Sequence, residues 1–391
     1  MKVLQICNKP PLPAVDGGCL AMHQLGTGLL NSDIDLTIIS ICTNKHPFEK
    51  DKLDEGYLEK TKSEFIYVDT DINVVDAFSS LITKDSYNIT RFFSPDLDQK
   101  IEHILKRKKF DCIILESVFV APYIETIRRE SKAKLILRAH NIEYKIWKRM
   151  AKQAGKGPKK LYYKHLSKRL KEFEINVWNQ VDGIATISSQ DKAYLNKKVD
   201  TPVVNIPFGI DLGDYEADLN ESNSVFHLGS LDWKPNLEGV SWFIDEVIPL
   251  VKSDIKFQVA GRNIPSWLGK MNQEKVEIVG EVESAKQYIA NQGIMIVPLL
   301  SGGGMRVKII EGMALSKPLI TTSIGAEGID VDHNEHVLIA DTAEDFADQL
   351  ERLYADKNLR KRLAINARKL IATNFDNKII IQKLIEFIEL I

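Results

Sequence analysis

The residues best suited to chemistry in this sequence lie between Ser301 and Glu311, in the stretch SGGGMRVKIIE. The apolar residues 294–298 precede this stretch and predict a short buried strand. Three glycines follow, and a helical pattern begins near Met305. A strand, a glycine turn and a helix start bring unpaired backbone N–H groups and the positive end of a helix dipole to one point. That arrangement is typical of an anion site, for which phosphate is the usual ligand.

Three charged side chains extend this prediction. Arg306 and Lys308 add positive charge in the first turn of the predicted helix, and Glu311 places a carboxylate where it can accept hydrogen bonds from sugar hydroxyls. This combination suits a nucleotide-sugar, which has a diphosphate for the cations and a ribose for the carboxylate. The alternative is a glycine-rich turn before an ordinary helix, with Lys308 and Glu311 paired at i, i+3.

The longer segment 301–329, SGGGMRVKIIEGMALSKPLITTSIGAEGI, resembles the donor-binding motif of the retaining glycosyltransferases called group 1, or family four. Such enzymes have the GT-B fold, in which two Rossmann-like, doubly wound parallel-sheet α/β domains face a cleft. The triple glycine is similar to one branch of the family, whereas many members have a glutamate at the position of Gly303. The resemblance implies that the backbone of Gly302, Gly303, Gly304 and Met305 takes part in donor binding.

The resemblance also implies roles for residues elsewhere in the chain. Gly17 and Gly18 match a glycine pair near the donor phosphate and the acceptor, with a plain tight turn as the alternative. His140, in the segment RAHNIEY, matches the active-site histidine, with a structural histidine at a strand end as the alternative. Donor-binding positions in the second half fall on Ser230, Lys234 and Arg262, and Ser230 stands where many relatives have an arginine.

The elements that must hold these residues alternate along the chain. Strand-like segments occur at residues 3–7, 36–41, 65–68, 112–115 and 135–137, and the alternation restarts at residues 225–228. Alternating strands and helices predict doubly wound parallel sheets, which bind ligands beyond the carboxyl ends of their strands. We expect an acceptor-side domain (1–212), a nucleotide-sugar-binding domain (213–374) and a terminal helix (375–391) that crosses back to the first domain.

Composition narrows the class of protein. A chain of 391 residues suits two domains, and the net charge of -2 gives no attraction toward nucleic acid. No run approaches the roughly 20 apolar residues of a membrane span, and the apolar run at residues 1–7 is too short for a secretory signal. The four cysteines have no metal-ligand spacing and are expected to be buried thiols in a reducing compartment. We therefore expect a cytoplasmic protein.

Residues 145–171 contain many Lys and Arg and no Asp or Glu, with Trp147, Tyr162 and Tyr163 among them. A basic helix pair that carries aromatic residues can lie on an anionic membrane surface. This interpretation predicts a peripheral protein at the inner face of the membrane. A solvated helix face is the alternative.

The resemblance implies a retaining, metal-independent glycosyltransferase of the hexosyltransferase type. Its catalytic residues would be His140, Arg306 and Lys308, and it would need no cofactor besides its donor substrate, a UDP- or GDP-linked sugar. The implied acceptor is a glycan or a lipid-linked glycan in cell-surface polysaccharide biosynthesis. A nucleotide-sugar epimerase of the same fold and a non-catalytic nucleotide-sugar-binding protein are the alternatives.

Overall fold

The computed structural model describes residues 1–49, 51, 53, 55–71, 87–217, 222–269, 274–302 and 306–391. The chain divides into two compact units. Unit 1 comprises Met1–Gly209 together with Ile380–Ile391, and unit 2 comprises Ile210–Ile379. The division predicted from the sequence places the boundaries after residues 212 and 374.

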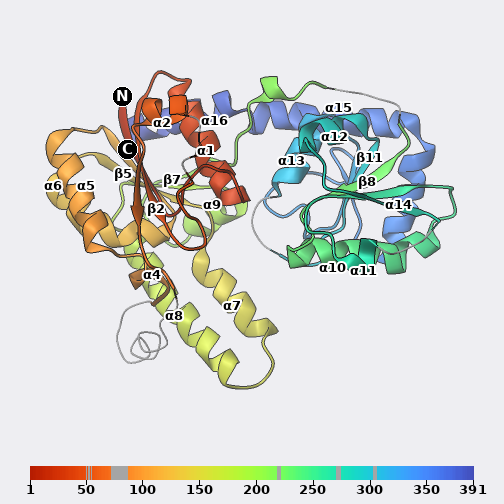
Figure 1. Cartoon of the computed structure of the whole chain (residues 1–391), viewed down its shortest axis with the longest axis horizontal. Coiled ribbons are helices and arrows are strands. Elements are labelled where there is room, and N and C mark those ends of the chain that lie inside the picture. Colours follow the sequence, from red (N-terminus) through yellow and green to blue (C-terminus); the bar gives the residue numbers. More distant parts are fainter. Residues whose placement is uncertain are drawn as a thin grey trace. The chain divides into compact units, whose positions relative to one another are not determined.

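Unit 1 contains, among its described residues, a seven-stranded parallel sheet with the order β3-β2-β1-β4-β5-β6-β7 (Figure 1). Its strands are β1 (Lys2–Cys7), β2 (Asp35–Cys42), β3 (Glu64–Tyr67), β4 (Cys112–Glu116), β5 (Lys134–Ala139), β6 (Gly183–Thr186) and β7 (Val203–Asn205). Its helices are α1 (Gly17–Leu30), α2 (Glu55–Thr61), α4 (Tyr87–Thr90), α5 (Pro95–Arg107), the 3-10 helix η2 (Val118–Tyr123), α6 (Ile124–Glu130), α7 (Glu143–Gln153), α8 (Pro158–Trp178) and α9 (Ser189–Leu195).

Unit 2 contains, within the part of the chain that the structure describes, a six-stranded parallel sheet with the order β10-β9-β8-β11-β12-β13. Its strands are β8 (Val225–Leu228), β9 (Phe257–Ala260), β10 (Val276–Gly280), β11 (Ile294–Val297), β12 (Leu319–Thr321) and β13 (Leu338–Ile339). Its helical segments are η3 (Leu212–Asp214), α10 (Lys234–Trp242), η4 (Phe243–Val247), η5 (Ile248–Leu250), α11 (Ser266–Gly269), α12 (Ala285–Asn291), α13 (Val307–Ala314), α14 (Ala343–Ala355) and α15 (Lys357–Asn374), and α16 (Asn377–Leu390) starts here and ends in unit 1.

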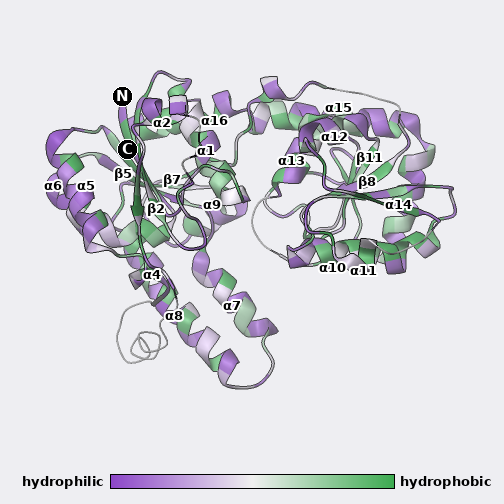
Figure 2. Ribbon diagram, viewed as in Figure 1, coloured by the Kyte–Doolittle hydropathy of each residue, from purple (hydrophilic) through white to green (hydrophobic). Residues whose placement is uncertain are grey.

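The strands are continuous apolar runs because helices cover both faces of each sheet. Val3, Leu4 and Ile6 of β1 are fully buried, and Figure 2 shows hydrophobic strands beneath helices with hydrophilic outer faces. The expected doubly wound α/β architecture is confirmed. Short strands β7 and β12 are not among the predicted segments, and the helix predicted to begin near Met305 starts at Val307 as α13.

Two long helices of unit 1, α7 and α8, form a hairpin that extends away from the sheet (Figure 1). The predicted break separates them: Gly157 has φ +149, and Pro158 starts α8. The buried Glu174 carboxylate on α8 caps α7 by accepting from the backbone N–H groups of Glu143 (3.0 Å) and Tyr144 (2.8 Å). Burial raises the pKa of Glu174 to about 8. The hairpin is therefore fixed at its base by the Glu174 carboxyl group, which accepts hydrogen bonds from the first N–H groups of α7.

The four cysteines, Cys7, Cys19, Cys42 and Cys112, are all buried and unpaired, as expected. Among the described residues, no helix combines the length and the apolar character needed to cross a bilayer.

The end of α16 completes the core of unit 1. Its apolar side chains pack in one cluster with residues of β1, β2, β4 and β5. These side chains are Ile380, Ile381, Leu384, Phe387 and Ile388. A Cβ added to Gly183 of β6 would lie 2.7 Å from the Phe387 ring, so this ring sits directly on the sheet. The helix is thus a structural part of unit 1.

We predict that Phe387→Ala lowers the free energy of unfolding of unit 1 by about 3–5 kcal/mol, because it leaves a cavity on the sheet. Leu390, which is 83% exposed on the same helix, is the matched control; Leu390→Ala should change stability by less than about 0.5 kcal/mol. Urea unfolding of the two variants measures the difference. Equal effects would contradict the packing described for α16.

Candidate functional site

Each sheet has a topological switch point, where the strand order reverses and the loops leave in opposite directions. This point lies between β1 and β4 in unit 1 and between β8 and β11 in unit 2. Ligands of open parallel sheets bind beyond the carboxyl ends of the strands at such points. The site residues predicted from the sequence are therefore expected at these two places.

In unit 2, the Lys308 ammonium lies at the carboxyl end of β8. Its Nζ donates to Asn236 Oδ1 (2.8 Å) and lies 3.5 Å from His227 Nε2. His227 Nδ1 is 3.0 Å from the carbonyl oxygen of Ile296. Because a carbonyl only accepts, Nδ1 carries the hydrogen and Nε2 presents a lone pair to the ammonium. Burial, followed by the charge of Lys308, holds the pKa of His227 well below its usual range.

Two glycines make room for this amine. A Cβ on Gly229 would lie 2.5 Å from Lys308 Nζ. Gly261 has φ +144, and a Cβ there would lie 1.9 Å from the carbonyl oxygen of Gly229. Only glycine tolerates both the backbone conformation and the approach at position 261. The loops after β8 and β9 therefore pack backbone against backbone beside the ammonium.

Lys308 is a cation whose described partners carry no negative charge. The described residues give it two neutral hydrogen-bond partners, Asn236 and His227, and no ion pair. Burial lowers the pKa of Lys308, the charge of Arg306 adds to this effect and Glu311 opposes it, with a result of about 7. The Lys308 side chain is half-buried. Shielding an ammonium from water without a counter-ion is costly, and an anionic ligand would supply the missing charge.

Glu311 follows Lys308 by three residues on α13 but makes a different contact. Its Oε1 accepts a hydrogen bond from Tyr215 Oη (3.1 Å), so the i, i+3 pair with Lys308 considered above is not formed. Burial raises the pKa of Glu311, against the lowering effects of Tyr215, Lys286 and Lys308. The Lys286 ammonium lies 4.5 Å from the centre of the Tyr215 ring. Glu311 thus retains a second carboxylate oxygen, Oε2, as an acceptor for a hydroxyl.

Arg306 precedes α13 and is 4% exposed. Its guanidinium lies 5.8 Å from the centre of the Trp233 ring, and Nη2 donates to the carbonyl oxygen of Ile324 (3.5 Å). The structure thus places Arg306 against an aromatic ring and a backbone carbonyl, which leaves Lys308 as the cation at the end of β8.

The other predicted residues of unit 2 are distributed around this point. Ser230 follows Gly229, and its carbonyl oxygen accepts from Asn236 Nδ2 (2.8 Å), so it borders the Lys308 environment. Lys234 is 84% exposed at its side chain and pairs with Glu238 (3.2 Å). Arg262 has an exposed side chain after β9. Gly302 has φ +108, and Gly303, Gly304 and Met305 lie outside the described residues.

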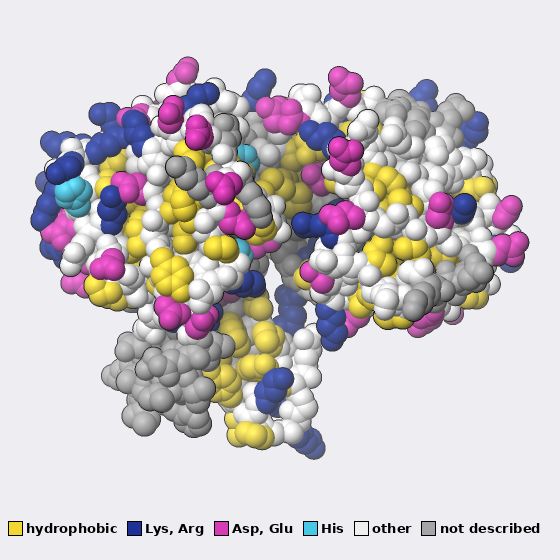
Figure 3. All heavy atoms as spheres, viewed as in Figure 1, with side chains coloured by type: hydrophobic (Ala, Val, Ile, Leu, Met, Phe, Trp, Pro, Cys, Tyr) yellow, Lys and Arg dark blue, Asp and Glu magenta, His cyan; other side chains and the backbone are white. Residues whose placement is uncertain are grey.

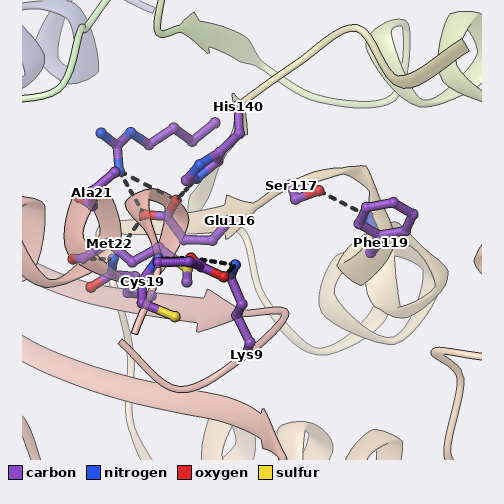
Figure 4. A network of polar contacts seen from close by, with 11 residues as sticks. Lys9, Cys19, Ala21, Met22, Glu116, Ser117, Phe119 and His140 are labelled. Atoms are coloured by element: carbon purple, nitrogen blue, oxygen red, sulfur yellow. Dashed lines mark hydrogen bonds and ion pairs between the residues drawn. The ribbon is translucent and has the colours of Figure 1, made fainter. Parts of the chain in front are cut away.

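In unit 1, His140 belongs to a buried polar network at the carboxyl ends of β4 and β5 (Figure 4). His140 Nε2 lies 2.5 Å from Glu116 Oε2, and Gln5 Nε2 donates to Glu116 Oε1 (2.8 Å). Arg138 Nη1 lies 3.4 Å from both Glu116 oxygens and donates to the carbonyl oxygen of Ala21 (3.1 Å). The predicted histidine is therefore held by residues from three neighbouring strands.

Gly17 and Gly18 open α1 at the end of the loop that follows β1. Asp16 caps this helix through the Cys19 N–H (2.9 Å) and pairs with Lys9 (2.6 Å) and with His46 (3.4 Å). Burial would raise the pKa of Asp16, but the bonds from Lys9 and from Cys19 lower it overall. Ligand atoms of Asp16, Cys19 and His46 lie within 4.8 Å of one another, and the Lys9 ammonium already neutralises this carboxylate.

The sequence interpretation did not single out Glu116, Gln5, Asn236 or His227. Three of them lie within or at the end of buried strands, where a polar residue interrupts an apolar run. A buried polar side chain requires a partner, so an isolated Gln, Glu or His in such a strand is the signal that could have identified them. Asn236 carried no comparable signal in the sequence.

The chain is similar to known proteins in sequence and in fold. Residues 222–356 match the model of the family described as glycosyl transferases group 1. This segment is therefore similar to the group 1 glycosyltransferases, and the chain, with its two parallel-sheet, Rossmann-like units, matches GT-B structures.

Three similar proteins illustrate the match. A 44.6 kDa uncharacterized protein in the cps region of Klebsiella pneumoniae is 26% identical, over 96% of this chain and 97% of the relative. The structure of HepE from Anabaena in complex with UDP has a TM-score of 0.69 at 13% identity, with 100% of both chains covered. Sucrose-phosphate synthase from Thermosynechococcus elongatus has a TM-score of 0.72 at 15% identity, covering 100% of this chain and 99% of the other.

We predict that Lys308→Met stabilises the protein near about pH 6 by on the order of 1 kcal/mol or more, because it removes a buried charge. The native pKa of about 7 lies below the unfolded value of about 10.4. The native state therefore releases the proton first, and wild-type stability should rise with pH from about 7 to about 10. Urea titrations across this range should show the advantage of the variant shrinking as the pH rises.

The matched control is Lys256→Met, since Lys256 is 65% exposed and pairs with Glu277 on the same unit. This variant should show no comparable pH-dependent gain. A destabilising effect of Lys308→Met at about pH 6, with the control neutral, would contradict the buried-charge interpretation.

Proposed function

We propose that this protein is a retaining glycosyltransferase of the hexosyltransferase type. It moves a sugar from a UDP- or GDP-linked donor to a glycan or lipid-linked glycan acceptor in cell-surface polysaccharide biosynthesis. The group 1 match and the GT-B fold support the general activity, and the relative in a cps region supports the biosynthetic setting. HepE, with the same fold, was solved with UDP and with UDP-glucose.

The observation that carries the proposal is the unneutralised Lys308 ammonium at the unit 2 switch point. A diphosphate placed there meets the ammonium and the first N–H groups of α13 together. During transfer, negative charge builds on the departing diphosphate, and a preorganised cation lowers the barrier. These groups of the chain perform the charge neutralisation that a metal ion performs in other transferases, so we propose a metal-independent reaction.

The remaining roles follow from the contacts of each side chain. Glu311, with Oε1 engaged by Tyr215, accepts a ribose hydroxyl through Oε2. Arg306 contributes long-range positive charge, since its guanidinium is turned to Trp233 and Ile324. His140 contacts the donor sugar or positions the acceptor. The other proposed donor-binding positions are Ser230, Lys234, Arg262, Gly17, Gly18 and residues 302–305.

A panel of UDP- and GDP-sugars, each incubated with and without lipid-linked and glycan acceptors, tests the activity. Transfer that is abolished by Lys308→Met and retained by Lys256→Met supports the proposal. Epimer formation without an acceptor would favour a nucleotide-sugar epimerase. Binding without hydrolysis or transfer across the panel would favour a non-catalytic binding protein.

We predict that the affinity for a nucleotide-sugar is constant below about pH 7 and falls about tenfold per pH unit above it. The reason is that the diphosphate favours the charged ammonium, so binding above the free-state pKa of about 7 requires proton uptake by Lys308. Isothermal titration in two buffers of different ionisation enthalpy measures this uptake. Lys308→Arg, which stays charged, should abolish the pH dependence; a pH-independent wild type would contradict the role of Lys308.

We also propose that the hairpin of α7 and α8 lies on an anionic membrane surface, which would place the protein at the inner face of the membrane. Residues 145–171 carry no acidic side chain, and most of their Lys and Arg side chains are exposed. Leu161 is 69% exposed, and the Trp147 and Tyr163 rings are in contact at 5.7 Å. Figure 3 shows hydrophobic and basic side chains next to each other on this hairpin.

We predict that replacing three hairpin lysines by Gln weakens binding to phosphatidylglycerol vesicles by more than about 100-fold, at about 1 kcal/mol per lysine. The variant changes Lys156, Lys159 and Lys160, and the control changes three exposed lysines of unit 2, Lys252, Lys256 and Lys361. Vesicle sedimentation measures both. Equal binding to neutral vesicles, or binding only to a soluble polyanionic glycan, would contradict the membrane proposal.

A further inference from the structure

The Glu116 carboxylate is the centre of the unit 1 network, and it is fully buried. Its Oε1 accepts from Gln5 Nε2, and its Oε2 faces His140 Nε2 at 2.5 Å. Arg138 approaches both oxygens at 3.4 Å. Gln5 Nε2 also donates to the carbonyl oxygen of Met22. Figure 4 shows the His140 ring directed at the Glu116 carboxylate, with Ala21 and Met22 of α1 nearby.

Three neighbours determine the charge of this carboxylate. Burial alone would raise the pKa of Glu116, but the charge of Arg138 and the hydrogen bonds from His140 and Gln5 outweigh it and lower the pKa. Glu116 is therefore ionised at neutral pH. An ionised carboxylate has no hydrogen to donate, so the short contact with His140 requires a hydrogen on Nε2.

We propose that Glu116 is a positioning residue that fixes a hydrogen on Nε2 of His140, so that Nδ1 accepts a hydrogen bond from a substrate hydroxyl. The chemical class of the ligand follows from this assignment. A lone pair on Nδ1 suits the hydroxyl of a sugar and repels a phosphate oxygen, which needs a donor. The identity of the hydroxyl as that of a donor sugar or glycan acceptor rests on the proposed function, whereas the tautomer does not.

Arg138 has a defined part in this arrangement. Its guanidinium is buried, bonds to the Ala21 carbonyl at the start of α1 and lies against Glu116. Its charge thereby keeps the carboxylate ionised. The orientation of His140 is thus fixed from the strands beneath it, which is the way preorganised sites hold a catalytic group.

The tautomer can be read directly by nitrogen-15 NMR on the full chain with labelled histidine. His140→Asn identifies the His140 signals among the eight histidines. In the wild type at about pH 7.5, we expect protonated Nε2 and unprotonated Nδ1. Glu116→Gln should move the hydrogen at least partly to Nδ1, because a glutamine amide can donate to Nε2.

The matched control is Asp182→Asn, which makes the same chemical change on a carboxylate that bonds the backbone N–H of Leu135 near the other end of β5. It should leave the His140 tautomer unchanged. A wild-type His140 with its hydrogen on Nδ1, or with both nitrogens protonated, would overturn the proposal. That measurement needs no variant of Glu116, so misfolding of Glu116→Gln cannot obscure it.

Kinetics provide a second readout once a donor is known. Glu116→Gln should lower kcat on the order of 100-fold or more, as a wrong tautomer does in other histidine enzymes, with the KM for the donor nearly unchanged. A purely structural role would instead lower the amount of folded protein at constant kcat. If the wild type transfers no sugar, the proposed function fails, and the NMR result still decides the role of Glu116.

Discussion

In unit 2, the end of β8 is arranged around the half-buried Lys308 ammonium, which has no ion-pair partner among the described residues and feels Glu311 only at longer range. Neutral acceptors on Asn236 and His227 hold it in place. Two glycines give it space, because the loops after β8 and β9 approach so closely that a side chain at position 229 or 261 would collide. The two neutral acceptors and the two glycines therefore together accommodate a single ammonium group. A group of this kind is a candidate for a binding site.

The two units differ in how the charge of a shielded side chain is neutralised. In unit 1, the Glu116 carboxylate is balanced internally by Arg138 and by hydrogen bonds, so its surroundings are close to neutral. In unit 2, the Lys308 ammonium has no ion-pair partner among the described residues. The first arrangement suits ligands that bring hydroxyl groups, and the second suits ligands that bring negative charge. The acceptor-side and donor-side roles of the two halves stay predictions from the resemblance.

The sequence was sufficient for the architecture and insufficient for the details of the site. Continuous apolar runs identified the long strands because burial on both faces leaves no other pattern, whereas β7 and β12 have three residues each and are too short to stand out. Arg306 and Lys308 looked equivalent as cations in one helical turn. Their difference arises from Trp233 and Ile324, which are distant in sequence. Glu116 was missed because its partners come from two other strands, β1 and β5, and from the residue that follows β5, and no local pattern records that convergence.

The chain order has a consequence for the way this protein is made. Unit 1 takes its core from residues 1–209 and again from residues 380–391, with the whole of unit 2 inserted between them. During translation, unit 2 can reach its native state while the sheet of unit 1 still lacks the helix that covers it. The apolar surface awaiting Ile381, Leu384 and Phe387 is then open on the ribosome. A nascent chain of this protein is thus a natural client for a chaperone that shields exposed hydrophobic surface until synthesis has passed α16.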